Sequence, residues 1–164
     1  MPTRSEVLFP DRPEYGAMTA SDTPVPPLTW NVVRSWLEAS RYFWVVTCRP
    51  DGRPHARPVW GIWLEPRFYF TTSPDTLMAR NIAAAGHGAV HPESAVDVVI
   101  IEGPIRGAGG RVPAEARAAY ESKYGVRTDP RDRGMPFYLL ETERAIAWNA
   151  RDPRASAARW TFRG

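Results

Sequence analysis

Hydrophobic and polar positions alternate most clearly over residues 42–72 of the chain. The run Tyr42–Cys48 is rich in aromatic and β-branched side chains, which suit a pleated, half-buried strand. The turn sequence Arg49-Pro-Asp-Gly52 follows, and its proline and glycine allow the chain to reverse direction. Residues 55–64 alternate as a second strand, and Phe68–Thr72 forms a third. The pattern therefore predicts a β-meander.

The second strand of this meander sorts its side chains onto two faces. One face carries Val59, Gly61 and Trp63, and the other carries Trp60, Ile62 and Leu64. After the third strand, Ser73 and Pro74 are expected to open a helix as its N-cap and first residue, and Gly86 to close it. Because a helix N-terminus has free N–H donors and a partial positive charge, this is a good place to hold an anionic group.

The rest of the chain predicts further strands in hairpin order and two more helices. The strands are expected at residues 88–92, 95–107, 137–148 and 159–162. The first helix is capped by Thr29 and carries one apolar face, formed by Trp30, Val33, Trp36 and Leu37. The other helix runs from Pro113 to Tyr124, with an inner face of Ala116, Ala119, Tyr120 and Tyr124, and a polar loop follows to Met135. We expect a mainly β (α+β) fold, a small antiparallel barrel with flanking helices.

Length and composition fit one globular domain that follows an N-terminal extension. The chain has 164 residues, of which residues 1–28 form a Pro-rich N-terminal extension and residues 29–164 the barrel domain. The net charge of +3 is too modest to indicate a nucleic-acid partner. No stretch approaches the ~18 apolar residues of a membrane span, and no signal peptide is evident. We expect a soluble, cytoplasmic protein that does not bind membranes.

Cysteine and histidine offer little chemistry in this sequence. The single Cys48 excludes an intrachain disulfide and a cysteine-based zinc cluster, and in an apolar strand we expect it to be buried and inert. His87 and His91 share a face but lack a third ligand, so no metal site is expected. His55 follows the first turn and is the first residue to test as a general acid or base, although a structural role is the simpler interpretation.

Arginine is the more informative residue type. Arg57 lies in a strand next to a proline, so it either pairs with a carboxylate or binds an anionic ligand. Arg80 and Asn81 lie on the helix expected after Ser73, where position alone favours a solvated face. No nucleophile elbow or lysine-containing phosphate loop is present.

Four segments in a fixed order resemble the pyridoxamine 5′-phosphate oxidase-like family, the split β-barrel superfamily of flavin and deazaflavin oxidoreductases. They are Arg49-Pro-Asp-Gly-Arg-Pro-His-Ala-Arg-Pro-Val-Trp60, Phe68-Tyr-Phe-Thr-Thr72, Ala79-Arg-Asn-Ile82 and Val98-Val-Ile-Ile-Glu-Gly103. The resemblance covers about residues 29–148. It implies a six-stranded antiparallel split β-barrel that forms a homodimer, with two sites for FMN or the deazaflavin F420 at the subunit interface. The cofactor would perform two-electron redox chemistry on a small organic substrate.

The resemblance also implies roles for individual residues. Arg57 matches a strand arginine that approaches the cofactor phosphate. The backbone beside the ring is matched by Val59, Trp60 and Gly61. The polar residues that lead into the phosphate-binding helix are matched by Thr71, Thr72 and Thr76, and the following Arg-Asn pair by Arg80 and Asn81. We expect Arg57, Thr72, Thr76 and Arg80 to bind the phosphate and Asn81 to support them.

One departure from the family pattern keeps a second hypothesis open. FMN-binding members often carry Ser-Arg-Lys where this chain has Thr76-Leu-Met78, and a strand lysine is replaced by Ile62. Two lost charge-assisted contacts are worth about 3–6 kcal/mol of phosphate binding. This favours F420 slightly over FMN. The alternative is a degenerate split-barrel module that binds haem or another planar ligand without redox catalysis.

Overall fold

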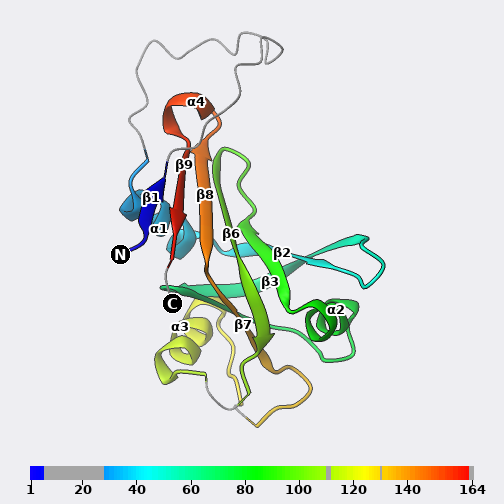
Figure 1. Ribbon diagram of the computed structural model, residues 1–164. Helices are drawn as coiled ribbons and strands as arrows, with labels where there is room; N and C mark the ends of the chain where they lie inside the picture. The colour runs from blue at the N-terminus through cyan, green and yellow to red at the C-terminus, as the bar shows by residue number, and fades with distance from the viewer. Residues whose placement is uncertain (6–27, 110–111, 130, 163–164) are drawn as a thin grey trace.

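The computed structural model describes residues 1–5, 28–109, 112–129 and 131–162 (Figure 1). Its strands are β1 (Thr3–Ser5), β2 (Tyr42–Cys48), β3 (Pro54–Leu64), β4 (Arg67–Thr71), β5 (His87–Pro92), β6 (Asp97–Gly107), β7 (Phe137–Glu141), β8 (Arg144–Asn149) and β9 (Ala158–Thr161). Its helices are α1 (Trp30–Ala39), α2 (Leu77–Ala85), α3 (Ala114–Tyr124) and α4 (Pro153–Ser156). The predicted mainly β fold with flanking helices is confirmed.

Six of these strands close into a barrel in which every pairing is antiparallel. The ring runs β6-β5-β2-β3-β4-β7 and returns to β6. The strands β8, β9 and β1 extend the sheet outward from β6. This is the six-stranded antiparallel split β-barrel that the sequence resemblance implied. Within the predicted N-terminal extension, β1 pairs with β9, and residues 6–27 lie outside the described residues.

The strand β3 is shared between the two parts of the barrel, a feature that the alternation of its side chains did not predict. Its first seven residues pair with β2, and from Gly61 onward it pairs with β4. A Cβ added at Gly61 would lie 2.1 Å from Cζ of Phe68, so only glycine fits where the strand changes partner. Val59, Trp63 and their neighbours join the barrel interior, whereas Ile62 joins a second core cluster under α3.

The strand predicted over residues 137–148 is interrupted, and this prediction was wrong. The structure divides it into β7, which pairs with β4 and β6, and β8, which pairs with β6 and β9. The break lies opposite Gly103, where a Cβ would come within 1.9 Å of the Glu141 carbonyl oxygen. Close approach of the two backbones at this glycine lets the chain leave the barrel after β7 and continue in the outer sheet.

Three smaller expectations are also corrected. The second helix begins at Leu77 with Thr76 as its N-cap, because Ser73 and Pro74 form a turn in which the Ser73 carbonyl accepts from the Thr76 N–H. Cys48 is exposed rather than buried, since it ends its strand at the hairpin turn. Ala119 of α3 is exposed, whereas Ala116, Tyr120 and Tyr124 are buried as expected. The closing glycines of both helices, Gly86 and Gly125, adopt positive φ as predicted.

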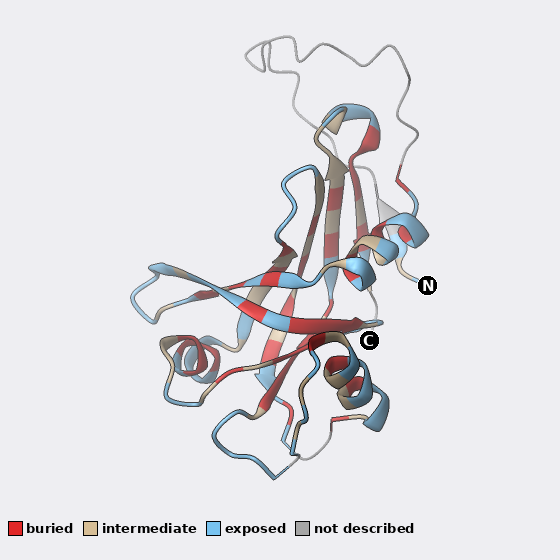
Figure 2. Ribbon diagram, turned by 180° about the vertical axis from the view of Figure 1, so that it is seen from behind, coloured by how far each residue is buried: buried red, intermediate tan, exposed pale blue. Residues whose placement is uncertain are grey.

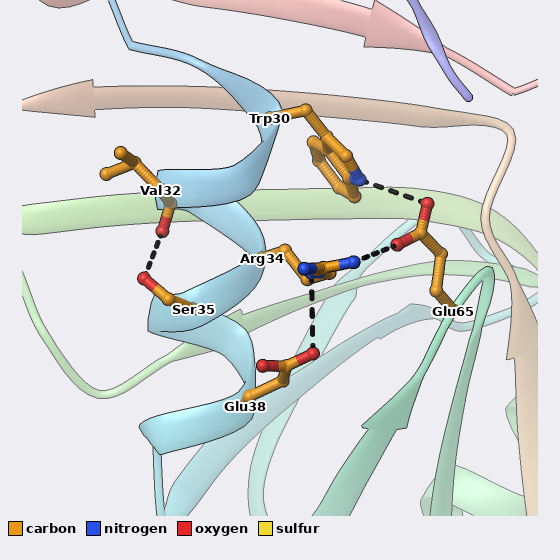
Figure 3. A network of polar contacts seen from close by, with 6 residues as sticks. All are labelled: Trp30, Val32, Arg34, Ser35, Glu38 and Glu65. Atoms are coloured by element: carbon orange, nitrogen blue, oxygen red, sulfur yellow. Dashed lines mark hydrogen bonds and ion pairs between the residues drawn. The ribbon is translucent and has the colours of Figure 1, made fainter.

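The helix α1 is fixed to the barrel by a polar network around Glu65, in the turn between β3 and β4. The Trp30 indole N–H donates to Glu65 Oε1 over 3.0 Å, and Arg34 lies 3.9 Å from Oε2 of the same carboxylate (Figure 3). Trp30, Val33 and Leu37 are buried against the barrel interior. Figure 2 shows that buried and exposed residues also alternate along the strands. None of the described helices is long and apolar enough to cross a membrane.

Candidate functional site

An open groove of about 580 Å³ runs along the outside of the barrel between β3 and α3. One side, which we call the near wall, is formed by residues 55–60 of β3, the end of β4 and the start of α2. The other side, the far wall, is formed by α3 and the loop that follows it. Ligand pockets in proteins are typically ~300–1,000 Å³, so the groove has the size of a small-molecule or cofactor site.

The near wall brings together most of the residues that the sequence singled out. Six of the nine predicted site residues line the groove, namely Arg57, Val59, Trp60, Thr71, Thr72 and Thr76. The other three, Gly61, Arg80 and Asn81, are not among the lining residues. The Arg80 guanidinium donates to the Asp75 carbonyl oxygen over 3.0 Å, so it lies against the turn before α2. His55 also lines the groove, two residues before Arg57 on the same face of β3.

The start of α2 opens onto the groove. Thr76 caps this nine-residue helix, because its hydroxyl accepts from the Ala79 N–H over 3.1 Å. The same hydroxyl donates to the Ser73 carbonyl over 2.9 Å and lies 3.3 Å from the Thr72 hydroxyl. By the geometry of a helix start, the N–H groups of Leu77 and Met78 have no intrahelical acceptor, and both residues line the groove.

Arg57 lines the near wall together with the start of α2. It is exposed, and it forms no ion pair with a carboxylate among the residues that the structure describes. A strand arginine without an internal partner is therefore available to an anion in the groove.

Behind the near wall, a buried polar chain leads from α2 to His55. The Asn81 side-chain amide donates to the Thr47 hydroxyl over 3.0 Å, and these residues are only 1% and 3% exposed. The Thr47 hydroxyl lies 3.5 Å from Nδ1 of His55 and 3.4 Å from its carbonyl oxygen. Asn81 thus contacts the groove only through Thr47 and His55, and the solvated helix face expected for it from position alone is not what the structure has.

Beside the groove, Tyr124 of α3 packs against the lining residue Trp60. Its ring stacks on Trp60 with a centroid distance of 4.8 Å and an interplanar angle of 0°. Its hydroxyl accepts from the Gly61 N–H over 2.8 Å and lies within donating distance of two carbonyls, that of Arg41 at 2.6 Å and that of Gly61 at 2.8 Å. Burial raises the pKa of Tyr124 to about 12, so the phenol stays neutral and keeps its proton.

Sequence reasoning missed the far wall. The residues of this wall that line the groove include Tyr120, Arg127, Thr128, Asp129, Asp132 and Met135. Glu121 anchors this loop, because its Oε1 accepts from both the N–H and the hydroxyl of Thr128, over 2.8 and 2.7 Å. These hydrogen bonds lower the pKa of the Glu121 carboxyl. The only signal in the sequence was the spacing of the two buried tyrosines on α3, which indicated a packed inner face and not a groove.

Elsewhere in the described residues, no three histidine, cysteine or acidic side chains gather closely enough to hold a metal ion. The site is therefore a groove with an unpaired arginine, a helix start and a stacked tryptophan, on a split β-barrel. These features define the candidate ligand site of this split β-barrel.

The sequence profile described as Pyridoxamine 5′-phosphate oxidase matches residues 30–149. The chain therefore belongs to the pyridoxamine 5′-phosphate oxidase family. No curated protein is similar enough in sequence to count as a relative.

Solved structures similar to this chain share its fold at low sequence identity. A haem-binding protein from Mycobacterium smegmatis has a TM-score of 0.63 at 19% identity, with 75% of this chain and 55% of that chain covered. An F420 reductase has a TM-score of 0.52 at 21% identity, covering 66% and 91%. A pyridoxamine 5′-phosphate oxidase-related, FMN-binding protein from Nostoc punctiforme has a TM-score of 0.51 at 13% identity, covering 81% and 93%. This chain thus spans about half the length of the haem-binding protein.

Proposed function

We propose that the protein is an oxidoreductase that binds F420 or FMN in the groove and acts on a small organic substrate. The observation that carries this proposal is the meeting of Arg57 with the start of α2 in one groove of cofactor size. A guanidinium that forms no ion pair among the described residues and free helix N–H donors suit a phosphate, and the side chain of Trp60 with the backbone of Val59 next to it suits a flat ring. When bound, the cofactor would supply hydride transfer.

Each predicted site residue has a role in this proposal. Arg57 and the hydroxyls of Thr72 and Thr76 bind the phosphate, and Thr71 continues this polar wall. Val59 and Trp60 lie beside the ring. The other three support the groove without lining it. The Gly61 N–H fixes the backbone next to Trp60, and the Arg80 guanidinium holds the turn before α2. Asn81 belongs to the buried hydrogen-bonded network that leads to His55.

The groove also suggests how the missing cations at Leu77 and Met78 are replaced. Their side chains carry no charge, but both residues line the groove, and their backbone N–H groups have no intrahelical acceptor. Backbone donors and the helix dipole together favour an anion at this position by ~1–2 kcal/mol, which offsets part of the loss. A phosphate bound mainly by one arginine and the backbone fits a cofactor with further anchoring groups, and this supports F420 over FMN.

A homodimer is part of the proposal because the groove is open on one side. The outer face next to it exposes three large aromatic side chains, Tyr42, Trp44 and Trp60, the last of them 44% exposed. Tyr42 and Trp60 are directly opposite each other in the β2–β3 ladder and both line the groove. A second copy packed on this face would bury the aromatic side chains and cover the ligand.

The test compares ligands that differ only in the phosphate. Whichever of FMN and F420 binds the wild-type protein, Arg57→Ala is expected to weaken it at least about tenfold, the loss of one charge-assisted contact. If FMN is the ligand, riboflavin, which lacks only the phosphate of FMN, is expected to bind wild type and variant equally. Arg53→Ala is the matched control, because Arg53 lies in the hairpin turn and pairs with Asp51. Unchanged affinity in Arg57→Ala would remove this assignment.

The second candidate is a binding module for haem or another planar ligand. It is favoured by the apolar side chains of Leu77 and Met78 at the helix start, and by His55 and Met135, two side chains able to ligate iron, in the same groove. A titration with haemin separates the two functions. A Soret shift that His55→Ala abolishes would support the binding module, whereas free-haemin spectra throughout would leave the oxidoreductase.

A further inference from the structure

Two cations lie together against the Tyr124 ring, next to the groove but outside its lining. The Arg41 guanidinium carbon is 5.6 Å from the ring centroid, and the Lys123 ammonium nitrogen is 5.8 Å from it. Lys123 also lies 5.1 Å from the centroid of Phe43, a residue of the barrel interior. Arg41 is exposed and Lys123 half-buried, so both are reachable from solvent.

Neither cation has a negative partner among the residues that the structure describes. The ion pairs of the protein involve other arginines, and none involves Arg41 or Lys123. Lys123 donates to one acceptor, the Gly61 carbonyl oxygen, over 3.3 Å. That oxygen is shared with the Tyr124 hydroxyl.

The titratable groups around Lys123 do not compensate its charge. They are Arg41, which is also positive, and the phenol of Tyr124, which keeps its proton. Burial, and secondarily the repulsion from Arg41, lowers the pKa of Lys123 to about 8. A structural lysine is usually held by a carboxylate, whereas this one is destabilised as a cation by its surroundings.

We propose that Arg41 and Lys123 form a binding site for an oxyanion, the carboxylate or phosphate group of a small-molecule ligand. A guanidinium presents paired donors that match either group, and an ammonium adds a point charge. The site adjoins the groove, because Tyr42, the residue after Arg41, lines the groove. Trp60, which also lines the groove, stacks on the Tyr124 ring that both cations contact. It requires no cofactor, so its test is independent of the proposed redox function.

The experiment uses Lys123 as its own reporter. It is the only lysine of the chain, so reductive methylation with ¹³C-formaldehyde gives a single side-chain amine signal besides the terminal amine. The pKa of this amine is measured by NMR without ligand, with inorganic phosphate and with benzoate. Because an anion stabilises the ammonium form, we expect the pKa to rise by at least one unit at saturation, a tenfold preference of the anion for the protonated protein.

Two variants sharpen the result. Arg41→Gln is expected to raise the pKa of Lys123 without ligand, since a repulsive charge is removed, and to weaken the response to anions at least tenfold. Arg127→Gln, which removes an arginine from the far wall, is the matched control and should leave both unchanged. A response to benzoate alone would identify an organic carboxylate as the ligand, and a response to phosphate alone a phosphate group. A pKa that neither anion moves would overturn the proposal.

Discussion

The two walls of the groove are built in different ways. The near wall consists of hydrogen-bonded strands and the capped start of α2. It carries Arg57, which forms no ion pair among the described residues, and the backbone N–H groups of the helix start. The far wall consists of one helix and an irregular loop, with aromatic rings, one arginine and two aspartates. Each wall contacts the other through few side chains, of which Tyr124 and Tyr120 are buried.

This difference suggests that the two walls have different functions and different effects on stability. The near wall has the donors to which we assign anion binding, and its backbone positions are set by the barrel itself. The far wall is positioned by single side-chain contacts, namely Tyr124 with Gly61, Tyr120 with Thr71 and Glu121 with Thr128. Substitutions in the barrel should therefore change global stability, and substitutions at these contacts should change the groove with smaller costs in stability.

The largest effect is expected at the glycine where the two walls meet. Gly61→Ala would place a methyl group 2.1 Å from the buried Phe68 ring, and we expect a loss of about 3 kcal/mol in the free energy of unfolding. Gly107→Ala is the control, because nothing lies within 4 Å of its added Cβ. Urea denaturation measures both. Equal stabilities would show that the ring moves aside freely and that the contact does not constrain the strand.

A smaller effect is expected from the phenol that joins α3 to β3. Tyr124→Phe keeps the stack on Trp60 but leaves the Gly61 N–H without its acceptor, which costs about 1–3 kcal/mol. Tyr120→Phe removes only the 2.9 Å contact with the Thr71 hydroxyl and should cost less. Chemical denaturation ranks the two variants. The reverse order would mean that the far wall is held at Tyr120 instead.

The helix caps provide a third comparison. Thr76→Ala removes the side chain that caps α2 and should destabilise the protein by about 1 kcal/mol. Thr29→Ala is the matched control, since Thr29 occupies the same position of α1 but makes no side-chain capping hydrogen bond. Thermal unfolding should show a clearly lower Tm for Thr76→Ala alone. Similar losses in both variants would argue against a special role for the α2 cap.

The smallest effect concerns pH and Lys123. Its pKa in the folded protein, about 8, is below the unfolded value of 10.5, so the unfolded chain binds more protons between these values. Stability should therefore rise with pH across this window relative to Lys123→Met, which lacks the group. The difference is expected to be modest, because Lys123 is partly solvated. It is measured by denaturation at pH 7.5 and 10, and parallel curves for both proteins would contradict it.

The near wall could be predicted from sequence because its signals are local. Alternation along residues 55–64 assigned Val59 and Trp60 to opposite faces of one strand, as the structure has them. The start of α2 was placed at Ser73 because Ser-Pro fits a helix cap and a turn equally well, and only the tertiary structure selects Thr76. Position alone placed Asn81 on a solvated helix face, because its partner Thr47 lies 34 residues away in the sequence.

The far wall could not be predicted, because nothing in residues 125–135 is periodic. Its position depends on contacts such as that of Tyr124 with Gly61, which are 63 residues apart. The break between β7 and β8 is equally non-local, since it depends on the close approach at Gly103. The position of the far wall and the break between β7 and β8 both depend on contacts between residues far apart in the sequence. The pattern of a single sequence does not reveal which of its distant residues come into contact.

The central claim is that the groove binds a planar, negatively charged redox cofactor beside Trp60. The most direct test is a fluorescence titration of the purified protein with FMN and with F420, repeated with Trp60→Phe and with Trp30→Phe, a tryptophan of the interior. We expect at least one cofactor to quench the fluorescence saturably with one molecule per chain, and Trp60→Phe to lose more of the quenching than Trp30→Phe. No saturable quenching of the wild-type protein by either cofactor would contradict the claim.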